Sequence, residues 1–194
     1  TMGSSTCKDC QAGQRSKKLD TNPPRDSCVD CPEGKYEQNR VTCVKCPSGT
    51  YQPSTKVSNV SSCISCPAGT HSANIGAKLH SDCEKCAVGK FSGATGMSVC
   101  DACAAGTYSS TEGTSTCSVC PGGTHSSSEG ATSNSTCISC EPGKYSSPAG
   151  APPSTCAQCT TSACGVGSYR GSCGAGASFD APCQACTGKP LNAS

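Results

Sequence analysis

Nine Cys-x-x-Cys pairs follow one another at intervals of 15 to 21 residues, and this pattern limits the possible fold more than any other feature of the chain. After them come Cys164, Cys173 and a tenth pair, Cys183 and Cys186. A fixed internal period is typical of repeat proteins, in which each repeat is one small structural unit. The nine pairs are 7/10, 28/31, 43/46, 63/66, 83/86, 100/103, 117/120, 137/140 and 156/159.

The chain has too few apolar residues for an ordinary hydrophobic core. Leu, Ile, Val and Phe number 17 of its 194 residues, well below the roughly 20% that a globular core requires. Its 22 cysteines are at the level of a disulfide scaffold. A net charge of +2 and the absence of Trp argue against nucleic acid as a partner. No run of apolar residues is long enough to span a bilayer, so we expect no membrane contact within this segment.

The cysteine pairs allow two kinds of cross-link. Two neighbouring pairs have the spacing of a zinc site with four thiolates. Two observations argue against zinc. Cys164 and Cys173 are not part of any Cys-x-x-Cys motif. The N-glycosylation sequons at Asn59, Asn134 and Asn192 suit an oxidising secretory route. We therefore expect disulfides, possible N-glycans at these three asparagines, a secreted or cell-surface location, and no metal or other cofactor.

The spacing favours one disulfide connectivity. A bridge within Cys-x-x-Cys closes a very small, strained ring, whereas a bridge from the second Cys of one pair to the first of the next closes a loop that holds one hairpin. We call the eight resulting loops modules one to eight, in chain order. They are Cys10–Cys28, Cys31–Cys43, Cys46–Cys63, Cys66–Cys83, Cys86–Cys100, Cys103–Cys117, Cys120–Cys137 and Cys140–Cys156.

Modules two to eight open with near-copies of one six-residue pattern, written CPSGTY at 46–51. Glycine stands three residues after every opening Cys, and it takes a positive φ without a Cβ penalty, so we predict a tight turn. Proline is expected at position i+1 of that turn, because its φ is already fixed. The last residue of the pattern should begin a strand and cover the neighbouring disulfide. This aromatic position holds Tyr36, Tyr51, His71, Phe91, Tyr108, His125 and Tyr145.

The six-residue pattern resembles the opening of the ephrin-receptor-like cysteine-rich repeats, which are related in pattern to tumour-necrosis-factor receptor modules. The resemblance is carried by Cys, Pro, Gly and Tyr at 31–36 and at 46–51, and it spans nearly the whole chain. Cys86 and Cys103 depart from it because Ala follows them, and the first module, CQAGQR, has no aromatic residue. The resemblance implies the same eight disulfides, in which each opening Cys is joined to the next Cys along the chain.

The tail, CAQCTTSACGVGSYRGSCGAGASFDAPCQAC at 156–186, resembles a second kind of module in this family, in which the third cysteine pairs with the fifth and the fourth with the sixth. That resemblance implies two crossed bridges, Cys159–Cys173 and Cys164–Cys183, which leave Cys7 and Cys186 unpaired. We interpret the chain as a window from a longer repeat protein; an intermolecular bond or a 7–186 bond is the alternative. The domains are then the end of a preceding module (1–9), eight tandem modules (10–156), a receptor-type module with crossed disulfides (157–183) and the start of a following module (184–194).

No arrangement of side chains in the sequence points to catalysis, so we predict no enzyme and no catalytic residues. His71 and His125 stand where other modules have Tyr or Phe, and we interpret them as aromatic substitutes. His80 is interpreted as isolated in a loop. The basic run at 15–18 is interpreted as an exposed loop insert.

The predicted fold is small and disulfide-rich: an elongated tandem array of short β-hairpin modules, each touching only its neighbours, with no large hydrophobic core. We expect a non-catalytic, glycosylated structural segment of a secreted or cell-surface filament or stalk. Its partners would be other chains of an extracellular assembly and covalent glycans. Similar repeats in surface proteins of algae and other protists imply a flagellar hair (mastigoneme) component. The alternative is the ligand-binding ectodomain of a cell-surface receptor, although monotonous Ser/Thr/Gly loops favour the structural role.

Overall fold

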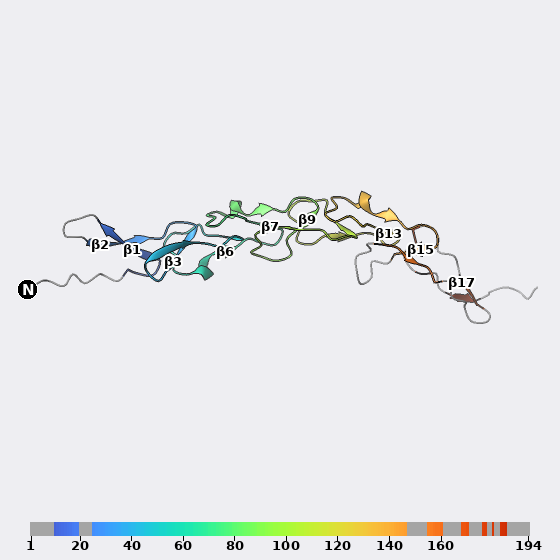
Figure 1. The fold of residues 1–194 in the computed structure, drawn as a ribbon, viewed down its shortest axis with the longest axis horizontal. Helices are drawn as coiled ribbons and strands as arrows, with labels where there is room; N and C mark the ends of the chain where they lie inside the picture. The colour runs from blue at the N-terminus through green and yellow to red at the C-terminus, as the bar shows by residue number, and fades with distance from the viewer. Residues whose placement is uncertain are drawn as a thin grey trace, which may run out of the picture. The chain divides into compact units, whose positions relative to one another are not determined.

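The computed structural model describes residues 10–19, 25–146, 155–160, 168–170, 176–177, 180 and 183–185. Within them, short strands form nine two-stranded sheets, in each of which a strand pairs with the next one along the chain (Figure 1). The pairs are β1 (Gln14–Leu19) with β2 (Arg25–Asp30), β3 (Lys35–Gln38) with β4 (Thr42–Lys45), β5 (Thr50–Tyr51) with β6 (Ile64–Ser65), β7 (Thr70–His71) with β8 (Glu84–Lys85), β9 (Lys90–Phe91) with β10 (Asp101–Ala102), β11 (Thr107–Tyr108) with β12 (Ser118–Val119), β13 (Thr124–His125) with β14 (Ile138–Ser139), β15 (Lys144–Tyr145) with β16 (Ala157–Gln158), and β17 (Ser168–Arg170) with β18 (Cys183–Ala185).

Eight disulfides close the eight modules, each with its Cα atoms 5.5 to 5.8 Å apart. The fold is therefore a disulfide-rich array of hairpins, as predicted. The bonds are Cys10–Cys28, Cys31–Cys43, Cys46–Cys63, Cys66–Cys83, Cys86–Cys100, Cys103–Cys117, Cys120–Cys137 and Cys140–Cys156.

The predictions for the two ends of the chain fall largely outside the described residues. Cys159 is disulfide-bonded, while its predicted partner Cys173 lies outside the described part of the chain. The same holds for Cys7, Cys164, Cys186 and Asn192. The backbone of Cys183 is described as part of β18, but the 164–183 bridge is not.

The spacer of each Cys-x-x-Cys pair from 63/66 onward is itself a strand. Thr50 pairs with Ser65 and Tyr51 with Ile64, so that the two residues after Cys63 form the return strand of module three. Both spacer residues are exposed. The hairpin thus closes just outside its disulfide loop rather than within it. The same role belongs to β8, β10, β12, β14 and β16, whose residues are likewise exposed.

Module length follows from one optional turn. The disulfides of modules five and six span 14 residues, whereas those of modules three, four and seven span 17. The difference of three residues is one 3₁₀ turn directly before the closing Cys, the usual length for this tight helix. These turns are η1 (Val60–Ser62), η2 (His80–Asp82) and η3 (Asn134–Thr136).

The interior of the described modules consists largely of disulfide sulfur and polar side chains, most of them serine. The opening cysteines of modules two to eight are 0 to 1% exposed, and the residue after the aromatic position is buried as well. Large apolar side chains lie outside, with Ile75 62% and Ile138 63% exposed. The predicted lack of a large hydrophobic core is confirmed. The buried polar residues after the aromatic position are Glu37, Gln52, Ser72, Ser92, Ser109, Ser126 and Ser146.

The six-residue pattern forms a corner, a four-residue turn that starts one residue later than predicted in the modules where proline directly follows the opening Cys. The backbone N–H of Thr50 donates to the carbonyl of Pro47 over 3.3 Å, and the Thr50 hydroxyl donates to the same oxygen over 2.7 Å. Gly49 has φ of 80°, which places it at i+2, where a type II turn needs a positive φ. Proline is therefore at position i in this corner, and the prediction of i+1 is wrong. In module eight, where the turn runs from Glu141 to Lys144, Pro142 does occupy i+1.

The prediction for the basic run at 15–18 is also wrong. These residues lie in the six-residue strand β1, where Arg15 pairs with Val29 and Lys17 with Ser27. The basic run is therefore part of the first hairpin, in which Ser16 and Lys17 are exposed and Arg15 is half-buried.

The chain divides into two compact units, the first made of Thr1–Ala87, Phe91–Asp101 and Glu112–Thr116, and the second of Val88–Lys90, Ala102–Thr111 and Cys117–Ser194. We describe each unit by itself. Both contain the same backbone hydrogen bonds between successive modules.

In the first unit, the corner of module two is held by module three through three backbone hydrogen bonds. The N–H of Gly34 donates to Gln52 (2.8 Å), the N–H of Lys56 donates to Cys31 (2.8 Å), and the N–H of Cys46 donates to Gly34 (2.9 Å). Buried backbone groups that would otherwise lack partners are satisfied by the next module. Each module therefore needs the one that follows it to complete its hydrogen bonding.

The second unit repeats the pattern. Gly89 donates to Ser109 (2.8 Å), Cys103 donates to Gly89 (2.9 Å), and Gly130 donates to Cys103 (2.7 Å). The described part of the tail module follows the same rule, because Gly176 donates to Cys140 over 2.9 Å and Ala177 bridges to Tyr145. This attachment therefore continues from module eight into the described part of the tail.

Corner glycines also contact the module after the next one. A Cβ on Gly34 of module two would overlap the backbone carbonyl of Gly76 in module four, and a Cβ on Gly89 of module five would overlap that of Gly130 in module seven. Only glycine permits this approach of two backbones. The expectation that each module touches only its immediate neighbours is therefore wrong, because contacts within each unit reach the second neighbour.

Candidate functional site

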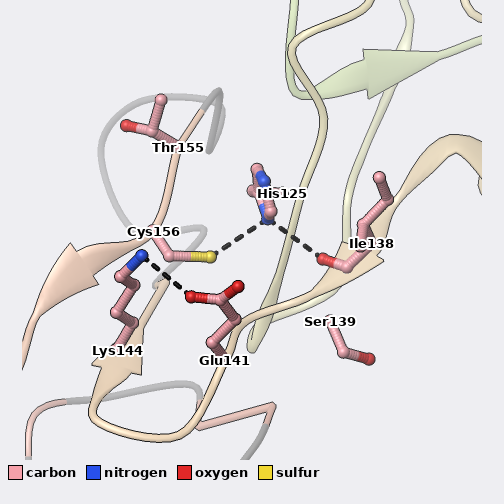
Figure 2. Close-up of a pocket in the computed structure, with 7 residues that line it drawn as sticks. All are labelled: His125, Ile138, Ser139, Glu141, Lys144, Thr155 and Cys156. Carbon is pink, nitrogen blue, oxygen red and sulfur yellow. Dashed lines mark hydrogen bonds and ion pairs between the residues drawn. The ribbon is translucent and has the colours of Figure 1, made fainter.

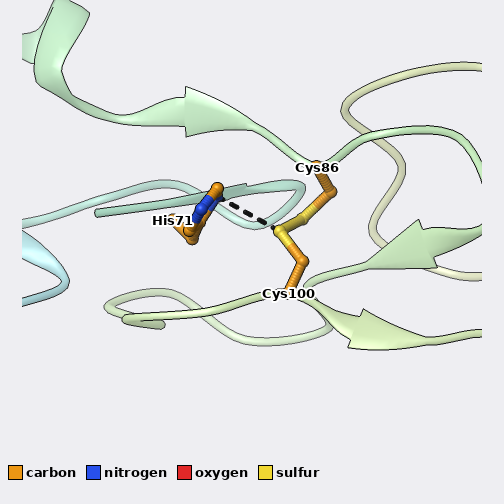
Figure 3. A group of neighbouring side chains, drawn as sticks. All are labelled: His71, Cys86 and Cys100. Carbon is orange, nitrogen blue, oxygen red and sulfur yellow. Dashed lines mark hydrogen bonds between the residues drawn. A yellow bond between two sulfur atoms is a disulfide. The ribbon is translucent and has the colours of Figure 1, made fainter. Parts of the chain in front are cut away.

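The residue at the aromatic position covers a disulfide in the two modules that carry histidine there, and it is the last residue of a strand, not the first as predicted. His71 ends β7 and lies opposite Glu84 of β8. Its Nδ1 atom is 3.2 Å from the carbonyl oxygen of Glu84 and 3.3 Å from Sγ of Cys100 (Figure 3). The covered bridge, Cys86–Cys100, belongs to the following module. This agrees with the predicted covering role.

His125 repeats this arrangement in the second unit. It ends β13 opposite Ile138 of β14, and its Nδ1 atom is 3.1 Å from the Ile138 carbonyl oxygen and 3.0 Å from Sγ of Cys156. Figure 2 shows His125 and Cys156 at an open cavity, beside an ion pair in which Lys144 Nζ lies 3.1 Å from a carboxylate oxygen of Glu141.

The geometry assigns the proton on both imidazoles. A carbonyl oxygen only accepts hydrogen bonds, so Nδ1 of His71 and of His125 must carry the hydrogen that it receives. The same N–H is then the group that faces the disulfide sulfur. Each histidine is thus fixed by its cross-strand partner as a hydrogen-bond donor directed at a disulfide.

Two groups have the composition of a metal site but not its chemistry. The ring nitrogen of His71 and the sulfurs of Cys86 and Cys100 lie within 4.8 Å of one another, and the equivalent atoms of His125, Cys140 and Cys156 do the same. A metal needs thiolates and a ring nitrogen with a free lone pair. Here the sulfurs are joined in disulfides and the nearby nitrogen is protonated. We conclude that neither group is a metal centre in the oxidised protein.

We predict that protein purified without reductant contains well under one zinc per four cysteines, because disulfide sulfur does not act as a thiolate ligand. Elemental analysis together with a free-thiol assay would test this. About one zinc per four cysteines, with matching free thiols, would contradict the disulfide assignment.

His80 is not isolated, contrary to the interpretation of the sequence. It lies in η2, and its ring meets the ring of Tyr51 edge-on, with the centroids 5.7 Å apart. Tyr51 belongs to module three and His80 to module four, so the contact joins two modules. No local sequence signal marks His80, because the contact depends on the position of the 3₁₀ turn.

A carboxylate in the same turn also has a structural role. Asp82 accepts hydrogen bonds from the backbone N–H groups of Leu79 (2.9 Å) and Lys78 (2.7 Å). These bonds hold the pKa of Asp82 below its ordinary value, with that from Leu79 the larger cause. Asp82 caps the turn, as short polar side chains commonly do at such ends.

Two predicted glycosylation sites lie in exposed loops, but not at equivalent positions. Asn59 is exposed and precedes η1, whereas Asn134 is exposed and is the first residue of η3. The backbone equivalent of Asn59 is Ser133, since both are extended, with φ of −159° and −156°. The two asparagines are thus offset by one residue along the same turn.

Comparison with known proteins supports the resemblance seen in the sequence. The family model described as tyrosine-protein kinase ephrin type A/B receptor-like matches residues 36–83 and 89–137, which together make up half of the chain. Curated proteins give no match. Among the described residues, no helix has the length and apolar character needed to cross a membrane.

Proposed function

Since this chain belongs to the ephrin type A/B receptor-like family of cysteine-rich repeats, we propose that it is a non-catalytic structural segment of a secreted or cell-surface filament or stalk. The repeats are of an extracellular type. The observation that supports the proposal most is the recurring backbone attachment, in which each described corner is completed by the next module, as at Gly34 and Gln52. Such attachment suits a chain that holds its shape by repetition.

The side chains of the modules support the same role. Buried polar residues such as Ser92 and Ser109 bond to nearby backbone carbonyls, and the Asp82 carboxylate caps a turn. The polar groups named here thus serve the fold. The partners we propose are further chains of an extracellular assembly, of which a flagellar hair (mastigoneme) is the most specific version.

An antibody against the loop of module six at 110–116, most of which is exposed, would test this function in cells of the native source. Immunogold labelling should follow extracellular fibres at regular intervals. Labelling confined to the plasma membrane, together with capture of a soluble protein ligand by the purified chain, would instead support a receptor ectodomain and contradict the structural proposal.

We predict N-glycans at Asn59 and Asn134 in protein from the native source, because both sequons are exposed and a secretory route exposes them to glycosylation. Peptide mass spectrometry before and after enzymatic removal of N-glycans would detect a mass change at each asparagine. Replacement of Ser61 and Thr136 by Ala removes each sequon in turn and serves as the matched control. Unmodified asparagine at both sites would count against the secretory route.

A further inference from the structure

The described disulfides differ in what lies against them. The N–H of His71 is directed at Cys100, and that of His125 at Cys156. In the other modules that carry the pattern, the aromatic position holds Tyr or Phe, whose ring edges carry no N–H donor. Modules five and eight are therefore the two whose disulfide has an imidazole donor from the preceding module.

Access to solvent does not account for this difference. Cys100 and Cys156 are partly exposed, while their partners Cys86 and Cys140 are 0 and 1% exposed. The same division occurs in modules two, three, six and seven. There the closing cysteines are partly exposed (Cys43, Cys63, Cys117 and Cys137), and the opening cysteines are buried (Cys31, Cys46, Cys103 and Cys120). Partial exposure of the closing cysteine is thus shared by these six modules, and the histidine is the distinguishing feature of modules five and eight.

We propose that Cys86–Cys100 and Cys140–Cys156 are exchangeable disulfides, at which an external thiol adds covalently through Cys100 and Cys156. Thiol–disulfide exchange is faster when the departing sulfur is stabilised as a thiolate. The imidazole N–H contacts the sulfur that is attacked, and the ring nitrogen also lies within 4.8 Å of the sulfur that departs, so a hydrogen-bond donor is close to the thiolate as it forms.

The exchange in module eight balances without any further oxidant. The incoming thiolate forms a bond to Cys156 Sγ, the Cys140–Cys156 bond breaks, and its electron pair leaves on Cys140 Sγ. The incoming thiol is oxidised to a mixed disulfide and Cys140 is reduced to a thiol, which takes up the proton that the incoming thiol has lost. The ring nitrogen of His125 lies within 4.8 Å of both sulfurs, so the imidazole is close to the departing thiolate of Cys140 as well as to Cys156.

The surroundings of Cys156 leave room for the incoming group. Cys156, His125 and Thr155 line an open cavity (Figure 2). Lys144 and Glu141 also line the cavity, and because they form an ion pair they add no net charge to it. The thiol class that fits is therefore a small-molecule thiol or an exposed cysteine on another protein.

Glutathione at neutral pH, followed by alkylation and peptide mapping, tests the proposal on the intact chain. Glutathione should appear on Cys156 and Cys100 before any other described cysteine. His125→Phe, which reproduces the side chain of Phe91, should slow opening of Cys140–Cys156 about tenfold or more, while Cys86–Cys100 keeps its rate and serves as the internal control. The converse variant Tyr108→His should speed the opening of Cys120–Cys137, the bridge of the following module.

Two results would overturn the proposal. One is opening of the Tyr- and Phe-adjacent bridges as fast as the two beside histidine. The other is an unchanged rate at Cys140–Cys156 in His125→Phe. Circular dichroism of the oxidised variants shows whether they are folded. Tyr108→His is a second control, because misfolding of His125→Phe cannot explain faster opening of Cys120–Cys137 in a different variant whose other bridges keep their rates.

Discussion

Complete reduction and alkylation should unfold every described module and leave no protease-resistant core. Closing loops of the size found here, with sequence separations of 12 to 18 residues, stabilises a protein by about 3 kcal/mol each. A typical domain has a net stability of only about 5–15 kcal/mol. The interior offers little to replace the disulfides, because it consists of their own sulfur and of side chains such as Ser72 and Ser92.

Far-ultraviolet circular dichroism and limited proteolysis before and after reduction would measure this loss. A mock-treated sample that keeps its disulfides controls for the alkylating agent. If the reduced protein kept its spectrum and its protease resistance, a source of stability other than the disulfides would be holding the fold.

The features that the sequence predicts best are local and covalent. A glycine three residues after each opening Cys has few roles other than a positive φ, and all eight corner glycines, from Gly13 to Gly143, adopt one of 74° to 83°. The scarcity of Leu, Ile and Phe likewise predicts an interior without an apolar core. Both inferences depend on single residues and on composition, which need no knowledge of the fold.

The approach of second-neighbour backbones could not be predicted, because the residue that meets the corner has no fixed place in the sequence. In module four this residue is Gly76, seven residues before the closing Cys83. In module five it is Gly96, four residues before the closing Cys100. In module three it is not glycine but Lys56, with a φ of 60°. The 3₁₀ turn accounts for the change from seven to four, and only the structure reveals that turn.

The histidine site was predictable in part. Substitution of His for Tyr or Phe at 71 and 125 places both rings over the next module, and this follows from the pattern. The direction of Nδ1 does not, because it depends on a hydrogen bond to the cross-strand carbonyl of Glu84 or Ile138. A proton on a particular ring nitrogen is a property of that pairing and not of the residue type.

Gly89→Ala should destabilise modules five and seven together, whereas Gly130→Ala should lower the free energy of unfolding much less. Both glycines have a positive φ, 77° and 65°, so alanine at either costs about 1–2 kcal/mol from backbone conformation alone. A Cβ on Gly89 would in addition overlap the backbone carbonyl of Gly130, whereas a Cβ on Gly130 would meet nothing closer than 3.8 Å, the distance to the carbonyl oxygen of Gly89. We expect a total loss of about 3 kcal/mol or more for Gly89→Ala, since two backbones must move apart.

Hydrogen exchange followed by mass spectrometry would locate the damage in each variant. In Gly89→Ala, protection should fall both at the Cys103 amide, which donates to Gly89, and at the Gly130 amide, which donates to Cys103, because the displaced carbonyl of Gly130 belongs to module seven. In Gly130→Ala the loss should stay near residue 130. Equal losses in the two variants would mean that the second-neighbour contact carries no stability, and that module five depends on module six alone.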